Sequence, residues 1–187
     1  ACNTATAMAL EVLKNNFKDT PIIGVIESGA IQASLDSRNK KIGVIGTVAT
    51  INSRAYDIAL RLVDNKIQVF SKECPLFVPF VEEGMVEGEA INLIVEHYLS
   101  SFQNNIDTMI LGCTHYPLLK PVIKDFVKDI KLVDSASATA FHAKNILIKT
   151  NLMSEVENLN ELQCFVTDLP RKFEKLGKIF FGETINQ

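Results

Sequence analysis

Short apolar runs alternate along the chain with longer segments of helical period, and this alternation restricts the fold more than any other feature. Several of the runs have no polar face, as expected of strands that helices cover on both sides. Such an order is typical of β-α-β units and predicts an α/β fold with a mostly parallel sheet. The expected strands are residues 22–26, 41–46, 66–70, 108–111, 132–133 and 163–167. The expected helices are residues 4–16, 28–36, 51–63, 78–101, 117–126, 136–149 and 170–181.

The composition is that of an ordinary globular protein. Of the 187 residues, 47% are hydrophobic and 22% are charged, with a net charge of −3. The lysines are dispersed and form no basic groove, so we expect no nucleic-acid partner. No apolar run approaches the ~18 residues that a membrane-spanning helix requires, so we expect no membrane segment.

The four cysteines lie far apart and include no C-x-x-C pair. This spacing favours neither a zinc site nor a disulfide scaffold, so we expect no metal. Free thiols of this kind are typical of the reducing cytoplasm, which is the expected location. Cys74 and Cys164 follow or enter apolar runs and are interpreted as core residues.

Cys113 lies where a buried strand meets the start of a helix. The strand ends at Gly112, and Pro117 suits the first turn of the following helix. Free N–H groups at a helix start attract carboxylates and lower the pKa of a thiol from its free value of ~8.5. Cys2 lies in a similar small–Cys–polar–polar sequence before a helix. Both turns therefore predict a thiol that exchanges protons beside an anionic ligand.

Paired thiols suit racemisation, because a racemase without a cofactor needs one base on each face of the stereocentre. Other interpretations remain open at this point. Buried cysteines are common core residues, and the fold could serve a non-catalytic ligand-binding domain. A metal site built from Cys2, Cys113 and His115 lacks the paired-ligand spacing of known sites.

Five motifs in series resemble the glutamate racemases of the aspartate/glutamate racemase superfamily. They are ACNTA (1–5), PIIGVI (21–26), GVIGTVATI (43–51), CPLFVP (74–79) with EEG (82–84), and LGCTHYP (111–117). The resemblance implies cofactor-independent interconversion of L- and D-glutamate, which supplies D-glutamate for peptidoglycan. It also makes a homodimer plausible. The nearest alternative is a racemase of another acidic amino acid, such as aspartate.

The resemblance further implies two pseudosymmetric, Rossmann-like three-layer domains with the active site between them. Residues 1–26 and 142–187 would belong to the first domain, and residues 27–141 would form the second. The strand and Asp-Ser-Gly turn that open the family's sequence would lie upstream of Ala1. The first domain is therefore expected to be incomplete in this chain, and the chain alone to be poorly active.

Functional residues carry over by position. Cys2 and Cys113 would be the paired acid–base thiols, His115 would assist Cys113, and Glu82 would support catalysis. The remaining residues expected to contact the substrate, together with His115, are Asn3, Thr4, Thr47, Thr50 and Thr114. Simpler roles stay open for some of them: Thr47 and Thr50 could be helix caps, and Glu82 could lie on a solvated helix face.

Overall fold

A computed structural model describes residues 1–103, 105–154, 165 and 177. The chain divides into two compact units, Ala1–Thr150 and Asn151–Gln187, and the elements below belong to the first. Apart from Phe165 and Gly177, the expected strand 163–167 and helix 170–181 lie outside the described residues, as does Cys164. The proposed division into residues 1–26 with 142–187 and residues 27–141 therefore stays a prediction.

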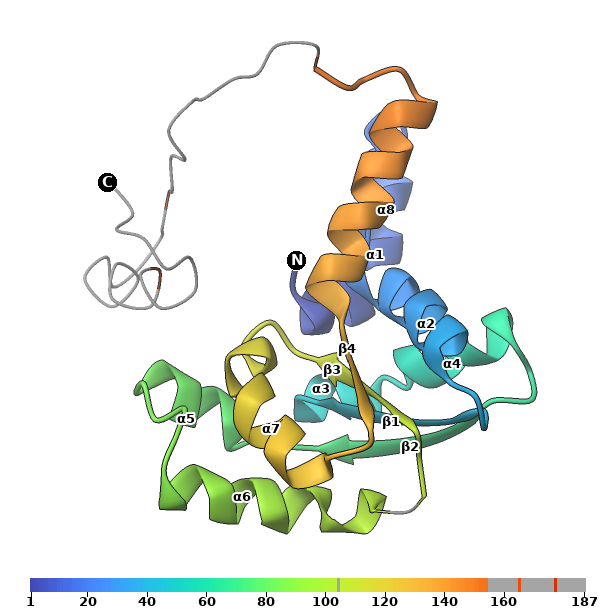
Figure 1. The fold of residues 1–187 in the computed structure, drawn as a ribbon. Coiled ribbons are helices and arrows are strands. Elements are labelled where there is room, and N and C mark those ends of the chain that lie inside the picture. The colour runs from blue at the N-terminus through green and yellow to red at the C-terminus, as the bar shows by residue number, and fades with distance from the viewer. Residues whose placement is uncertain (104, 155–164, 166–176, 178–187) are drawn as a thin grey trace. The chain divides into compact units, whose positions relative to one another are not determined.

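The helices and strands follow one another as the alternating pattern predicts (Figure 1). In chain order they are α1 (Asn3–Asn16), α2 (Val25–Asp36), β1 (Lys41–Gly46), α3 (Val48–Asn52), α4 (Ala55–Val63), β2 (Gln68–Glu73), α5 (Phe77–Glu82), α6 (Glu89–Leu99), η1 (Ser100–Phe102), β3 (Thr108–Gly112), η2 (Tyr116–Leu119), α7 (Lys120–Val127), β4 (Lys131–Asp134) and α8 (Ser135–Lys149).

Four parallel strands form the sheet in the order β2-β1-β3-β4. Ile42 and Val44 of β1 pack in a cluster with residues of α2 and α4 on one face. Ile45 and Leu111 belong to a second cluster, with residues of α5, α6 and α7 on the other face. Figure 1 shows α2 and α4 on one side of the sheet and α6 and α7 on the other. The expected α/β fold with three Rossmann-like layers is confirmed.

Some boundaries differ from expectation where the backbone turns in ways that hydrophobic period does not record. The expected strand 22–26 is wrong, because α2 begins at Val25 and residues 22–24 pair with none of the four strands. The expected helix 51–63 is divided into α3 and α4 at Arg54, where φ is 56°. The expected helix 78–101 is divided at Gly84 and Gly88, where φ is 75° and 96°. None of the helices in the described part of the chain has the length and hydropathy that crossing a membrane requires.

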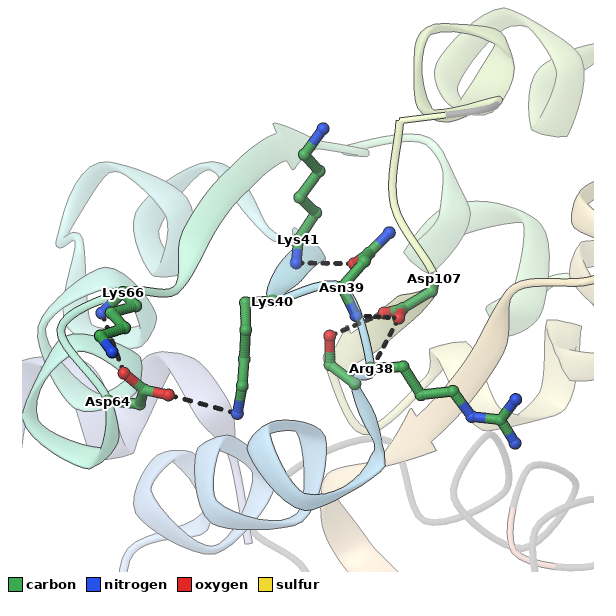
Figure 2. A network of polar contacts seen from close by, with 8 residues as sticks. Arg38, Asn39, Lys40, Lys41, Asp64, Lys66 and Asp107 are labelled. Carbon is green, nitrogen blue, oxygen red and sulfur yellow. Dashed lines mark hydrogen bonds and ion pairs between the residues drawn. The ribbon is translucent and has the colours of Figure 1, made fainter.

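Asp107 fixes the chain at the amino ends of the strands (Figure 2). Its carboxylate accepts hydrogen bonds of 2.7 Å from the Ser37 hydroxyl and from the backbone N–H groups of Arg38 and Asn39. Burial raises the pKa of Asp107, but these bonds outweigh burial and hold the pKa below its ordinary value. This carboxylate therefore anchors the loop before β1 to the start of β3.

Candidate active site

The topology places a switch point at the carboxyl ends of β1 and β3. The chain leaves β1 toward β2 on one side and leaves β3 toward β4 on the other, although β1 and β3 are neighbours. Open α/β sheets bind ligands at such a switch point. Gly46 pairs with Gly112 in the register, so the next residues, Thr47 and Cys113, follow the two strands at the same edge.

The Cys113 turn is tightly packed. Cys113 is 7% exposed. A Cβ atom on Gly112 would lie 2.7 Å from the carbonyl oxygen of Ile45, so only glycine fits directly before the cysteine. The Cys113 Sγ atom lies 3.8 Å from Nδ1 of His115, and the Thr114 hydroxyl lies 3.4 Å from the same nitrogen. The thiol, the imidazole and the hydroxyl predicted from the sequence are therefore brought together.

Glu82 joins this group from a distant part of the chain. It is the last residue of α5, and its Oε1 atom lies 3.4 Å from Nε2 of His115. The imidazole of His115 thus lies between the carboxylate and the thiol, with one ring nitrogen facing Glu82 and the other facing Cys113. A carboxylate in this position fixes the orientation and tautomer of an imidazole that exchanges a proton with a neighbour.

Burial raises the pKa of the Cys113 thiol above its ordinary value. The backbone N–H groups of His115 and Tyr116 and the hydroxyl of Thr114 lower this pKa, as expected at a helix start, but burial outweighs them. The net shift is therefore opposite to the one expected from the sequence. Charge on Cys2 raises the pKa of Cys113 further, an effect that requires the two thiols to lie near each other.

The Cys2 turn is open to solvent and is held by polar contacts. Cys2 is exposed and caps α1, its Sγ atom accepting a bond of 3.5 Å from the N–H of Ala5. The Thr4 hydroxyl lies 2.9 Å from that of Thr47 and 3.1 Å from that of Thr50. The last two hydroxyls are 3.0 Å apart, and Thr47 also caps α3. Thr47 therefore caps α3 and is also a member of a cluster of three hydroxyls.

Asn3 is 1% exposed, and its amide group is engaged inside the protein. Its oxygen accepts a bond of 2.6 Å from the Tyr56 hydroxyl, and its nitrogen donates to the Ser135 hydroxyl at 3.5 Å. No sequence pattern singled out Tyr56, which lies in an apolar helical run. Ser135 carried a usable signal, because it follows β4 as Thr47 and Cys113 follow their strands.

Cys74 lies in the hydrophobic core, in the same cluster as Cys113. Cys74 is fully buried, which confirms its interpretation as a core residue. Cys2, Cys74 and Cys113 are free thiols. Within the described residues, no group of three or more His, Cys, Asp or Glu side chains is placed to hold a metal ion.

Comparison with known proteins identifies the family. The model of the Asp/Glu/Hydantoin racemase family matches residues 1–143. The glutamate racemase of Aquifex aeolicus is 48% identical over 185 residues, which cover 99% of this chain and 69% of that protein. The chain belongs to the Asp/Glu/Hydantoin racemase family. This racemase is also similar to the glutamate racemase of Chlorobium phaeobacteroides, 46% identical over 182 residues that cover 96% of this chain and 67% of the relative.

Solved structures of family members confirm the fold of this racemase. Glutamate racemase of Francisella tularensis, in complex with D-glutamate, is 36% identical with a TM-score of 0.90. The match covers 99% of this chain and 69% of that one. Isoform RacE1 of Bacillus anthracis is 37% identical with a TM-score of 0.92, covering 98% of this chain and 69% of that one. The family predicted from the five motifs is confirmed, and with it the assignment to the isomerases.

Proposed function

We propose that the chain carries the two acid–base thiols of a glutamate racemase, Cys2 and Cys113. The observation that carries the proposal is the hydrogen bond of 2.9 Å between the hydroxyls of Thr4 and Thr47. Thr4 comes two residues after Cys2, and Thr47 follows β1 where Cys113 follows the neighbouring β3, so the two thiols are proposed to share one site at the carboxyl ends of these strands. The relatives that match nearly all of this chain are glutamate racemases, which favours glutamate as the substrate.

In the proposed reaction each thiol serves one face of the substrate. The thiolate on one side removes the proton from Cα, and the thiol on the other side returns a proton to the opposite face. One C–H bond breaks and one forms, so no oxidant, reductant or cofactor is needed. The roles exchange for the reverse direction, and the two thiols then regain their starting protonation through His115 or solvent.

The raised pKa of Cys113 suits this exchange. A thiol that burial keeps protonated near neutral pH is ready to donate, and its thiolate is a stronger base than that of an ordinary cysteine. His115 lies beside the sulfur and can accept or supply its proton, while Glu82 holds the imidazole in orientation. The N–H groups of His115 and Tyr116 stabilise the thiolate when it forms.

The hydroxyl cluster of Thr4, Thr47 and Thr50 is the proposed contact for a substrate carboxylate. Three hydroxyl groups lie within about hydrogen-bond distance of one another at the start of α1 and α3. Each can turn its O–H toward an anion, so the cluster can exchange internal bonds for bonds to the ligand. Asn3 and Thr114 complete the proposed set around the two cysteines.

A wider role follows from the same proposal. Glutamate racemisation would supply D-glutamate for peptidoglycan in the cytoplasm, where free thiols such as Cys2 and Cys113 persist. A homodimer, expected from the resemblance, remains part of the proposal. Light scattering of the purified protein would decide between a monomer and a dimer.

Substrate choice is tested by offering the full-length gene product L-glutamate, D-glutamate and both enantiomers of aspartate in heavy water. NMR follows deuterium at Cα, and chiral chromatography follows the opposite enantiomer. We expect exchange and inversion with both glutamates and neither with aspartate. Inversion of aspartate alone would assign the protein to the other branch of the superfamily, and binding of glutamate with no exchange would favour a non-catalytic binding domain.

A further inference from the structure

Tyr56 is one of the largest fully buried side chains, and its hydroxyl reaches the Cys2 turn. The residue lies in the first turns of α4 and is 2% exposed. Its hydroxyl donates a bond of 2.6 Å to the side-chain oxygen of Asn3, the residue directly after Cys2. The amide nitrogen of Asn3 then donates to Ser135 at the start of α8. One hydroxyl thus connects α4, the start of α1 and the start of α8.

The ring of Tyr56 reaches the other cysteine turn. A Cβ atom on Gly112 would lie 3.1 Å from Cε2 of Tyr56, so the ring packs directly against the residue before Cys113. Charge on Cys113 also contributes to the raised pKa of Tyr56, which places the phenol and the thiol near each other. Gly29 of α2 leaves room for this arrangement, because its Cβ would lie 3.3 Å from both the Tyr56 hydroxyl and the Ser135 Cβ atom.

We infer that Tyr56 is a positioning residue that sets the separation of the two cysteine turns, its hydroxyl holding Asn3 and its ring packing against Gly112. The inference rests on the proposed function, since separation matters only if both thiols act on one carbon. Neither thiol is touched by the hydroxyl itself, so Tyr56 acts through its neighbours. The inference also gives Asn3 a structural role at the Cys2 turn, in addition to the contact with substrate expected from the sequence.

The hydroxyl is suited to a permanent structural bond. Burial is the main cause that raises the pKa of Tyr56 well above its ordinary value, so the group stays protonated and remains a donor at every working pH. The side-chain oxygen of Asn3 can only accept. The bond therefore has a fixed direction, and it holds the start of α1 in one position while protons move at the nearby thiols.

The test compares Tyr56→Phe with Tyr98→Phe. Each change removes one buried tyrosine hydroxyl, but that of Tyr98 accepts from the N–H of Leu76 instead of bonding to Asn3. Steady-state racemisation of glutamate is measured in both directions, together with thermal unfolding. We expect Tyr56→Phe to lower kcat about tenfold or more while KM stays within about twofold, because a small misplacement of reacting groups costs rate rather than binding. Tyr98→Phe should keep kcat within about twofold of the unmodified protein.

Further variants separate this inference from the proposed function. Asn3→Ala removes the acceptor, so the double variant Asn3→Ala/Tyr56→Phe should be no slower than Asn3→Ala alone. An unchanged kcat in Tyr56→Phe, an equal loss in Tyr98→Phe, or additive losses in the double variant would each overturn the positioning role. All variants are made in the full-length gene product, and an unmodified full-length protein that inverts no glutamate would overturn the proposed function instead.

Discussion

The two cysteine turns share a sequence pattern but are held in different ways. Cys113 follows a strand that is buried along its whole length, and the cluster behind it contains the rings of Tyr116 and Phe77 in edge contact. Cys2 lies in solvent at the start of a helix, and that start is held by the bond that Asn3 accepts from Tyr56 and by the bond between the hydroxyls of Thr4 and Thr47. Packing therefore fixes one thiol, and a polar network fixes the other.

The difference sets the chemistry of each thiol. Burial raises the pKa of Cys113, so its readiness to give up a proton depends on its neighbours, above all His115 and the adjacent N–H groups. Cys2 is exposed to solvent, and its Sγ atom accepts a hydrogen bond from the N–H of Ala5. If the proposed pair is correct, the two faces of one carbon are served by thiols in different surroundings.

Replacement of either thiol should give the largest effect. Cys2→Ser and Cys113→Ser each remove one of the two proposed bases, and general acid–base catalysis is typically worth ~10²- to 10⁴-fold in rate. We expect each variant to lose at least this much racemase activity in both directions, measured by chiral chromatography. Cys74→Ser is the control for removal of a thiol outside the site. Full activity in either Cys2→Ser or Cys113→Ser would remove that residue from the proposed pair.

Glu82→Gln should lower kcat by weakening the contact with His115, the residue beside Cys113. A hydrogen bond to a charged group contributes about 1.5–3 kcal/mol, which corresponds to a loss of ~10- to 100-fold in kcat. The neighbouring Glu83 is exposed, and Glu83→Gln is the matched control that should leave kcat nearly unchanged. Equal rates in the two variants would show that the contact between Glu82 and His115 has no part in turnover.

Gly112→Ala should test how tightly the Cys113 turn is packed. The added Cβ would meet the backbone oxygen of Ile45 at 2.7 Å, and overpacking of this kind costs about 1–3 kcal/mol of unfolding free energy. Gly84→Ala is a useful comparison, because its Cβ meets nothing within 4 Å and only its positive φ opposes alanine, at about 1–2 kcal/mol. Urea unfolding monitored by circular dichroism measures both. If Gly112→Ala kept native stability and activity, the turn would have enough room for a Cβ atom, and the tight packing described above would be contradicted.

The smallest expected effect is electrostatic. The folded pKa of Cys113 lies above its unfolded value, so folding favours the protonated thiol, and this contribution to stability is lost as pH rises through the folded pKa. Alkylation of Cys113 by iodoacetamide, followed by mass spectrometry over a pH series, should therefore reach its midpoint at a higher pH in the folded protein than in the urea-unfolded protein. In Cys2→Ser the midpoint for Cys113 should move down, because a charge that raises its pKa is gone. No movement would place the two thiols too far apart to share a substrate.

The sequence predicted the parts of the fold that follow from burial. Strands β1 and β3 were recognisable because their residues are apolar on both faces, and the Cys113 turn because glycine and proline frame it. The breaks at Arg54 and Gly88 were missed, since apolar spacing continues through them while the backbone changes direction.

Long-range contacts limited the prediction of the site in the same way. The resemblance named Glu82 and His115 separately, but only the fold shows that the two side chains meet. The bonds of Asn3 join residues 53 and 132 positions apart, and no local pattern encodes such pairs. Tyr56 therefore looked like an ordinary core residue until the packing of α4 against the start of α1 was known.

The most direct test of two thiols on opposite faces is the early distribution of deuterium when pure L-glutamate reacts in heavy water. If Cys2 and Cys113 act from opposite sides, the base that removes the proton is not the acid that returns one. The first D-glutamate formed should then carry deuterium at Cα, while recovered L-glutamate carries almost none. D-Glutamate that retains the original hydrogen would indicate a single base acting on both faces and would contradict this account.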